Sequence, residues 1–159
     1  MTFKSLDPGK ALSFLSHPVT IITANDGKQL NGMTAAWTTQ ISIDPPILCT
    51  SISPKRYTWE MLENLEYFGV CQLAKGQEEI SNIFGTKSGR DLDKFELLDL
   101  KPFMAAHDVP LVPGSLAGFV CKKTHQTEQG DHFALFGEVI EAWQGEGKPL
   151  NWHRSRYLE

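Results

Sequence analysis

Apolar residues along this chain recur with the two-residue period of β-strands more often than with the period of helices. The strand-like runs are rich in β-branched and aromatic residues and are bounded by turn-forming residues. They cover residues 18–24, 37–43, 47–52, 68–73, 115–127 and 132–143. Helical spacing is confined to short segments at residues 7–15, 58–65 and 77–84. Strands that outnumber short helices, without a strand–helix–strand rhythm, predict a mainly β antiparallel barrel rather than a doubly wound sheet.

Residues 31–46 have the most unusual pattern, because small and polar residues precede a regular alternation. From Trp37 onward, Trp37, Ile41 and Ile43 fall on one face and polar residues on the other. This period predicts a strand with one buried, apolar face. Two prolines end the run, so the next apolar run, residues 47–52, is predicted to lie beside it.

The helical segments and one turn allow more specific predictions. Thr58 is expected to cap the helix at residues 58–65, with Met61 on its inward side. The first helix offers an apolar side that includes Leu12. Residues 128–131, with the sequence EQGD, predict a tight hairpin between the last two long strands.

Length, charge and cysteine usage narrow the class of protein. The 159 residues fit a single domain spanning residues 1–159. A net charge of −4 excludes the basic footprint of a nucleic-acid binder. No apolar run approaches the roughly 18 residues of a membrane span, and no signal peptide is evident. The three cysteines lack a CxxC pair, which predicts free thiols in a reducing compartment and a cytoplasmic location.

Nucleotide-binding motifs of the common kinds are absent. No GxGxxG sequence exists, so a Rossmann site is not supported. Residues 27–34 half-resemble a phosphate-binding P-loop, but Met33 stands where that loop requires lysine. Without this cation the β/γ-phosphate contact is lost, which argues against an NTPase.

Two other loops have the composition of a phosphate site. Residues 85–91 combine glycines, hydroxyls and two cations, and residues 53–58 combine hydroxyls with Lys55 and Arg56 at the entry to a helix. The alternative for each is a solvated surface loop. Their occurrence together in an acidic protein favours a ligand that carries phosphate.

Metal and hydrolase sites have little support. The histidines show no HExxH or paired spacing, and no metal site is predicted. His125 and His132 flank the predicted hairpin, which is a weak basis for metal ligation. A GxSxG nucleophile motif is also absent.

Six segments in order nevertheless resemble a known family. They are HPVTIITA, NGMTAAWTTQISIDPP, SISPKRYT, FGVCQL, FGTKSGRDLDKFE and GDHFALFGEV. Between His17 and Val139 they are similar to the flavin reductase-like FMN-binding split-barrel proteins, and within these to the flavoredoxin-type branch. The resemblance implies a six-stranded antiparallel Greek-key split barrel, a homodimer, and FMN bound near the dimer interface.

The resemblance also implies which residues bind the cofactor. Residues 31–38 would run along the flavin ring, residues 53–58 would meet the phosphate and ribityl chain, and residues 84–90 would close on the phosphate end. The implied cofactor-binding residues are Asn31, Met33, Thr34, Ala35, Ala36, Trp37, Thr38, Ser53, Pro54, Lys55, Arg56, Tyr57, Thr58, Phe84, Gly85, Lys87, Ser88, Gly89 and Arg90. Small residues suit the close approach of a planar ring, and cations with hydroxyls suit a phosphate.

Single residues outside these loops receive roles with alternatives. His132 matches a family histidine beside the flavin, which implies a catalytic contact with the nicotinamide; the alternative is a histidine that only hydrogen-bonds its turn. Trp37 is expected to pack the barrel or the dimer interface rather than to stack on the ring. In the tail, Trp152 and Tyr157, together with two arginines, either line the site or reach the partner subunit.

Three functions follow from this resemblance. The first is an NAD(P)H-dependent flavin reductase that transfers a hydride to FMN and electrons onward to an acceptor, with the choice between NADH and NADPH open. The second is a flavoredoxin-type carrier that takes electrons from a redox protein partner and has no NAD(P)H site of its own. The third is a barrel that binds heme or another tetrapyrrole.

Overall fold

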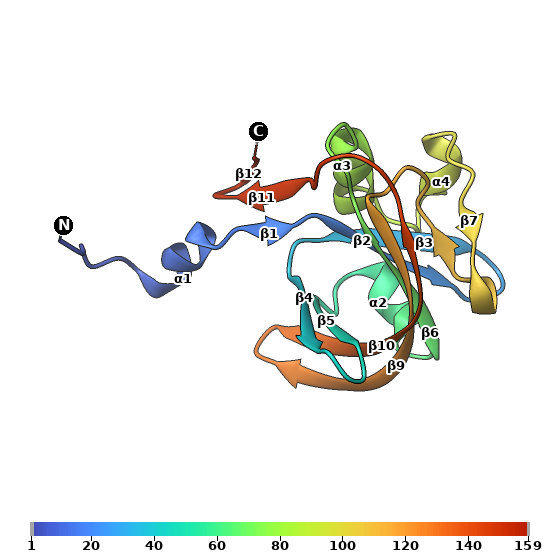
Figure 1. Cartoon of the computed structure of the whole chain (residues 1–159), viewed down its shortest axis with the longest axis horizontal. Helices are drawn as coiled ribbons and strands as arrows, with labels where there is room; N and C mark the ends of the chain where they lie inside the picture. Colours follow the sequence, from blue (N-terminus) through green and yellow to red (C-terminus); the bar gives the residue numbers. More distant parts are fainter. Residues whose placement is uncertain (1, 159) are drawn as a thin grey trace.

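One rolled antiparallel sheet organises the computed structural model, which describes residues 2–158 (Figure 1). Its strands are β2 (Thr20–Asn25), β3 (Leu30–Ala35), β4 (Thr38–Ser42), β5 (Ile47–Ile52), β6 (Tyr67–Gln72), β9 (Ala117–Gln129) and β10 (His132–Gln144). Short strands lie outside it: β1 (His17–Pro18), β7 (Phe103–Met104), β8 (Pro110–Leu111), β11 (Asn151–His153) and β12 (Arg156–Tyr157). The helices are α1 (Pro8–Ala11), η1 (Leu12–Phe14), α2 (Tyr57–Leu62), α3 (Glu78–Thr86), α4 (Lys94–Leu97) and η2 (Ala106–Asp108).

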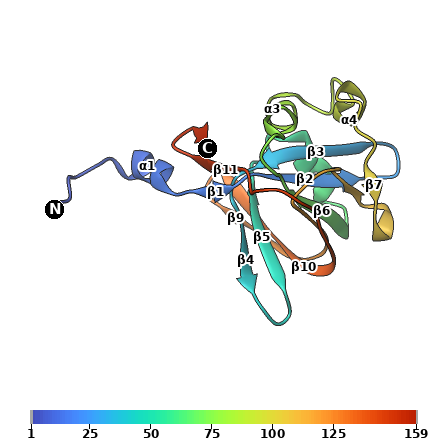
Figure 2. The same ribbon diagram turned by 45° about the horizontal axis from the view of Figure 1, so that its top comes forward.

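The order of strands explains how the sheet rolls. Its sequence of neighbours is β3-β2-β6-β9-β10-β5-β4, and every pair is antiparallel. Strands β3 and β4 are consecutive in the chain, yet they occupy the two opposite edges. Only Ala36 and Trp37 separate them, so one bent segment supplies both edges (Figure 2). The predicted mainly β antiparallel class is confirmed; the seven strands become the predicted six if this bent segment is counted once.

Two apolar cores lie on opposite faces of β2. Ile22 packs with α2 residues such as Trp59 on the inner face, whereas Ile21 packs with Phe84 and Phe95 of α3 and α4 on the outer face. Both isoleucines are fully buried. A strand covered on both faces needs no polar alternation, which is why residues 18–24 read as a continuous β-branched run.

The exposed edge strand β4 contradicts the predicted burial of its apolar face. Trp37, Ile41 and Ile43 are 54%, 49% and 85% exposed. Thr38 points inward instead, and its hydroxyl lies 3.0 Å from those of both Thr20 and Thr50. The alternation was correct, but no described segment of this chain covers the apolar face. The predicted pairing with β5 is confirmed.

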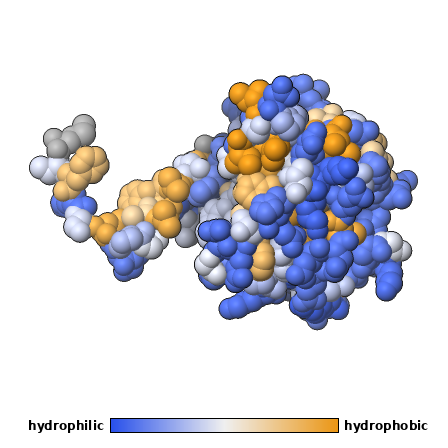
Figure 3. Space-filling model, turned by 90° about the horizontal axis from the view of Figure 1, so that it is seen from below, coloured by the Kyte–Doolittle hydropathy of each residue, from blue (hydrophilic) through white to orange (hydrophobic). Residues whose placement is uncertain are grey.

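The N-terminal segment has a similar apolar surface. Helix α1 begins at Pro8, where the Asp7 carboxylate accepts a hydrogen bond from the Lys10 backbone N–H. Its predicted apolar side exists, but Leu12, Phe14 and Leu15 are all more than half exposed. The segment projects away from the sheet with its apolar side chains visible (Figure 3).

Two helix predictions need correction. Arg56 rather than Thr58 is the cap of α2, and it makes no capping side-chain hydrogen bond. Thr58 is the second residue of the helix, which starts at Tyr57, and it is buried. A short helix that was not predicted, α4, follows the loop at residues 85–91, and the Asp93 carboxylate caps it by accepting hydrogen bonds from two backbone N–H groups.

The predicted hairpin and the free cysteines agree with the structure. Strands β9 and β10 pair along their length around a turn at Gly130, which has a φ of 64°. Cys71 and Cys121 are buried thiols, and Cys49 is half-buried. Burial raises the pKa of Cys71 and of Cys121 to about 12. Within residues 2–158, no helix combines the length and apolar character that a membrane crossing requires.

Candidate functional site

Two adjoining cavities lie where β3 bends toward β4. The larger, of about 310 Å³, is lined by Val19, Thr34, Ala36, Arg56, Ser81, Asn82, Gly85, Thr86, Trp152 and Tyr157. The smaller, of about 170 Å³, is lined by Met33, Thr34, Ala35, Ala36, Trp37, Ser51, Ser53, Arg56 and His132. Both linings include Thr34, Ala36 and Arg56, so the cavities form one groove around these three residues. We call it the bend groove.

The smaller cavity brings together residues that are far apart in the sequence. The backbone bend at Ala36 forms one wall, and the start of β10 places His132 opposite it. The rings of His132 and Trp37 have centroids 5.0 Å apart. His132 therefore lines a cavity together with the predicted ring-binding segment, and its contact with the nicotinamide stays a prediction.

The larger cavity is rich in hydroxyl groups. Thr34 donates a hydrogen bond of 2.6 Å to the Ser81 carbonyl, and the Tyr157 hydroxyl donates to the Ser81 hydroxyl at 3.0 Å. These bonds tie β3 and the C-terminal hairpin to α3. Arg56 reaches over from α2 and donates from Nη1 to the Gly85 carbonyl at 3.3 Å.

The charge of the bend groove differs in sign from that of the whole protein. Arg56 is a cation in both linings, and neither lining contains an aspartate or a glutamate, although the chain carries a net charge of −4. A concave surface with a cation, hydroxyls and no carboxylate favours an anionic ligand.

Asp131 orients the His132 ring. One Asp131 carboxylate oxygen lies 2.6 Å from Nδ1 of His132. This hydrogen bond lowers the pKa of the exposed Asp131 carboxyl. A hydrogen bond at one ring nitrogen fixes the orientation of the other. Asp131 therefore sets the orientation in which the His132 ring lines the groove.

Several predicted cofactor residues are buried in the protein rather than exposed in the groove. Asn31 is 2% exposed, and its side chain donates to the Thr58 hydroxyl at 3.1 Å. Thr38 and Phe84 are buried as well. These residues support the groove from behind; direct contact with a cofactor stays a prediction for each of them.

The small size of Gly32, next to Asn31, has a packing explanation. A Cβ atom there would lie 3.0 Å from the Ile22 carbonyl oxygen and 3.0 Å from the Phe84 ring. Gly32 therefore allows β3 to approach both β2 and α3. Part of the small-residue pattern comes from this contact, whereas Ala35 and Ala36 do line the groove.

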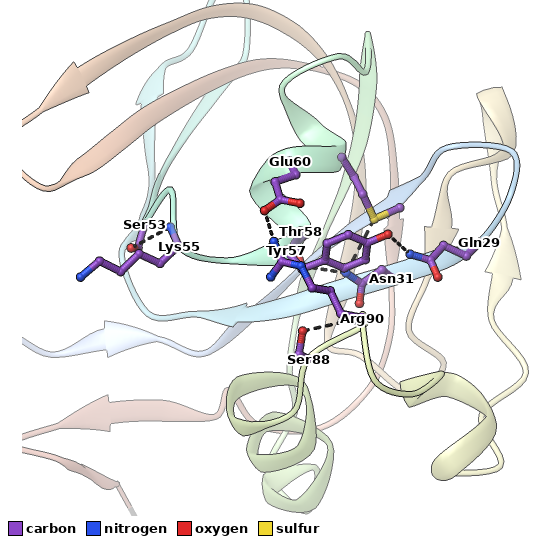
Figure 4. Close-up of polar contacts among 10 residues, drawn as sticks. Gln29, Asn31, Ser53, Lys55, Tyr57, Thr58, Glu60, Ser88 and Arg90 are labelled. Atoms are coloured by element: carbon purple, nitrogen blue, oxygen red, sulfur yellow. Dashed lines mark hydrogen bonds and ion pairs between the residues drawn. The ribbon is translucent and has the colours of Figure 1, made fainter.

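The predicted phosphate loop at residues 87–90 lies beyond both linings. Arg90 forms an ion pair with Glu60 of α2, and its guanidinium lies over the Tyr57 ring at 4.9 Å (Figure 4). Ser88 accepts a hydrogen bond from the Arg90 backbone N–H. Arg90 thus joins its loop to α2.

The other predicted phosphate residues divide in the same way. Ser53, Arg56 and Gly85 line the groove. Pro54, Lys55, Tyr57, Lys87, Ser88, Gly89 and Arg90 do not appear in either lining. A Cβ at Gly89 would meet the Asn31 side chain at 2.5 Å, so this glycine allows the loop to pack against β3. Cofactor contact by these residues remains a prediction.

Sequence reasoning missed two kinds of residue. Ser81 and Asn82 of α3 line the groove from a helix that was read only for its apolar side. Lys94 lies behind the groove, and it is 3% exposed. Trp152 and Tyr157 of the tail, which the sequence offered as candidates to line the site, do line the groove.

His125 takes no part in the groove. Its ring lies 5.8 Å from that of Phe136, its register partner on β10. Residues 2–158 contain no cluster of three or more metal-ligating side chains.

Comparison with known proteins identifies the family. Residues 12–159 match the family described as flavin reductase like domain. Over 140 residues the chain is 31% identical to the FMN reductase (NADH) SmoA of Agrobacterium fabrum, covering 88% of this chain and 77% of that protein. Over 149 residues it is 30% identical to the reductase component of 4-hydroxyphenylacetate 3-monooxygenase of Thermus thermophilus, covering 93% and 91%. It spans about half the length of some other curated relatives, 46% and 50% in two cases.

Solved structures give the same assignment. The chain superposes with a TM-score of 0.89 on the Streptomyces globisporus C-1027 NADH:FAD oxidoreductase SgcE6 in complex with NAD and FAD fragments, at 25% identity, covering 99% of this chain and 96% of that one. The family match extends over nearly the whole length, and the relatives named above reach 30% identity or more. This chain therefore belongs to the flavin reductase like family.

Proposed function

We propose that this chain is an NAD(P)H-dependent flavin reductase that binds FMN in the bend groove. The observation that carries the proposal is the lining of the groove, which holds Arg56 and several hydroxyls but no carboxylate. FMN combines a planar ring with a phosphate that carries close to two negative charges at neutral pH. The groove offers suitable contacts for both the ring and the phosphate.

The larger cavity suits the phosphate end. Arg56 offers a guanidinium that matches phosphate oxygens, and the Ser81 hydroxyl, which accepts from Tyr157 and keeps its own O–H, is an additional donor in the same lining. Within residues 2–158, the Arg56 side chain donates one hydrogen bond, from Nη1 to the Gly85 carbonyl at 3.3 Å. Its remaining N–H groups are available to a phosphate.

The bend of β3 into β4 suits the ring. Ala35 and Ala36 present backbone and methyl groups there, so a planar ring can approach closely and meet main-chain donors and acceptors. When bound, FMN accepts a hydride from the nicotinamide. The protein contributes mainly by stacking the two rings and by keeping water away from them.

His132 is proposed to position the nicotinamide. Its ring faces the smaller cavity beside Trp37, and Asp131 holds its Nδ1 side. The other ring nitrogen is then directed by this contact and can hydrogen-bond the carboxamide of the nicotinamide. No proton transfer by His132 is required for hydride transfer.

A homodimer is proposed on the basis of the exposed apolar surface. Trp37, Ile41 and Ile43, in and beside β4, and the N-terminal residues Leu12 and Phe14 are large apolar side chains exposed to water, and Leu12 and Trp37 line one further cavity. Exposed apolar patches and open edge strands usually mark an interface. Because Trp37 also lines the smaller cavity, a second copy at β4 would lie next to the flavin.

The acceptor of the electrons is proposed to be a separate protein. A relative that matches most of this chain is the reductase component of 4-hydroxyphenylacetate 3-monooxygenase. Reduced FMN, or electrons from it, would accordingly pass to an oxygenase component.

An anaerobic titration tests the proposal. Purified protein reconstituted with FMN is mixed with NADH or with NADPH, and the flavin absorbance is followed. Bleaching by one of the two nucleotides at a rate well above that of free FMN is expected. Bleaching only by a reduced iron–sulfur protein would overturn the reductase assignment in favour of an electron carrier.

The choice of flavin is tested by comparing dissociation constants for FMN, FAD and riboflavin. FMN is expected to bind at least tenfold more tightly than riboflavin, because a phosphate contact with Arg56 contributes about 1.5–3 kcal/mol. Equal affinity for riboflavin would mean that no phosphate site exists. Tighter binding of FAD would replace FMN as the preferred flavin.

A further inference from the structure

Lys94 is a buried cation without a carboxylate partner. Its side chain is 3% exposed. Among residues 2–158, no aspartate or glutamate oxygen lies within 4.0 Å of its nitrogen. Lysine is almost never fully buried unless it is paired. The position of this charge therefore requires an explanation beyond packing.

The ammonium group bridges the two walls of the bend groove. Its Nζ donates to the Gly32 carbonyl on β3 at 2.6 Å and to the Phe84 carbonyl in the last turn of α3 at 3.3 Å. The residues that follow these two carbonyls, Met33 and Gly85, both line the groove. Lys94 thus fixes the spacing of β3 and α3 at the point where the cavity begins.

The charged form of Lys94 is also destabilised in this position. An ammonium group has three N–H donors, and the described residues supply two acceptors. Burial, with a further contribution from the nearby Arg56 charge, lowers the pKa of Lys94 to about 8. Two cations are therefore held close together beside a groove without carboxylates.

We propose that Lys94 is a positioning residue of the flavin site, where its ammonium group joins the two walls of the bend groove and supplies positive charge behind them. The inference rests on the proposed binding of FMN. A dianionic ligand stabilises two neighbouring cations that repel each other in the free protein. FMN binding should consequently favour the protonated form of Lys94 and weaken once this proton is lost.

The other groups around Lys94 leave this dependence intact. Strand β3 and helix α3 present carbonyl oxygens to its nitrogen, and the Phe84 ring lies 5.5 Å away. Arg56 stays charged throughout the accessible pH range. On its own helix, Asp93 is engaged with the Phe95 and Glu96 N–H groups. The FMN phosphate is fully ionised above pH 7.

The test measures dissociation constants for FMN and for riboflavin between pH 7 and pH 9 in the full chain. For the wild type, FMN affinity is expected to fall about fivefold across this range, because one pKa unit of coupling would raise the pKa of Lys94 from about 8 in the free protein by one unit in the complex. Lys94→Arg keeps the charge at every pH and should remove the fall. Lys94→Met should bind FMN about tenfold more weakly at pH 7, with no fall. The exposed Lys101→Met serves as the matched control and should follow the wild type.

Binding of riboflavin distinguishes an effect of the Lys94 charge from an effect of the spacing between β3 and α3. Riboflavin lacks the phosphate, so its affinity should stay constant with pH in every variant. If Lys94→Met weakens FMN and riboflavin equally and the wild type shows no fall, Lys94 has only a structural role and the proposal is wrong. If Lys94→Met does not fold, the comparison of Lys94→Arg with the wild type decides. Absence of FMN binding in the wild type would instead overturn the proposed function itself.

Discussion

Polar residues are buried behind β3, whereas large apolar residues are exposed on the outer face of β4. Both arrangements are the reverse of the usual one. Behind β3, Asn31 and Lys94 are buried. On β4 and directly after it, Ile41 and Ile43 are exposed, although both strands belong to one bent segment. Burying polar groups and exposing large apolar ones both cost stability.

The difference matches the two partners proposed above, a flavin at the groove and a second copy of the chain at β4. Asn31 and Lys94 are both hydrogen-bonded, Asn31 to Thr58 and Lys94 to two carbonyls, so they hold the walls of the bend groove in place. The exposed isoleucines have no partner within residues 2–158, as expected of a surface that another chain covers. Trp37 belongs to both regions, since it is exposed and also lines the groove.

Breaking the apolar region should have the largest effect. Ile41→Lys combined with Ile43→Lys is expected to convert a dimer into monomers, with a dissociation constant raised about 1,000-fold, because about 4 kcal/mol of apolar burial is lost. Light scattering after size exclusion measures the mass. Gln40→Lys, on the same strand but outside the isoleucine face, is the control and should remain dimeric. A wild-type protein that is monomeric at every concentration would contradict the assignment of this surface.

Removing the cation of the groove should have the next largest effect. Arg56→Ala is expected to weaken FMN binding about 100-fold, or roughly 2.7 kcal/mol, because the charged contact with the phosphate disappears. Arg56 makes no capping side-chain bond to α2, so the helix should persist in circular dichroism. Lys28→Ala, at an exposed turn, is the control. Unchanged FMN affinity in Arg56→Ala would place the phosphate elsewhere.

Filling the bend should weaken binding less. Ala36→Leu is expected to lower FMN affinity about 30-fold, since the larger side chain enters the groove next to the ring. The same change at Ala35 is less informative, because Ala35 is 5% exposed and packs in the inner core, where a larger residue destabilises the fold by about 1–3 kcal/mol. Fluorescence titration compares the two variants. Normal FMN affinity in Ala36→Leu would exclude the ring from this position.

His132, which contacts Trp37 at the junction of the two regions, should affect turnover more than cofactor binding. His132→Ala is expected to lower kcat/KM for the nicotinamide substrate about tenfold, or about 1.4 kcal/mol, while FMN affinity stays within about twofold. Asp131→Asn should have the same effect in weaker form, because it loosens the orientation of the ring. Loss of FMN together with normal nicotinamide kinetics would show that His132 holds the flavin instead.

The sequence predicted the strands well where local signals decide. The run at residues 47–52, its pairing across residues 44–46, and the β9–β10 hairpin at Gly130 all agree with the structure. Periodicity also grouped Ile41 with Ile43 correctly. It could not tell whether another part of the chain covers this face, because burial depends on contacts far away in the sequence.

The groove was predictable only in part for the same reason. Ala36, Arg56 and His132 were named from short motifs, and all three line the cavities. Lys94 was missed because its acceptors, on Gly32 and Phe84, are separated from it by up to 62 residues. A lysine near a surface-like loop carries no local signal that it will be buried.

The smallest expected effect concerns the stability of the protein. It measures the cost of burying Lys94 separately from the proposed contribution of Lys94 to FMN binding. The pKa of this lysine is near 10.5 in the unfolded chain and about 8 in the folded one. Between these values the unfolded state holds more protons, so the contribution of Lys94 to the free energy of unfolding rises with pH. From pH 7 to pH 9, the wild type should gain about 1 kcal/mol relative to Lys94→Met in urea unfolding without ligand. With saturating FMN this relative gain should shrink, because the ligand keeps Lys94 protonated. A difference between the two proteins that stays constant with pH would mean that the buried ammonium is not destabilised in the folded state.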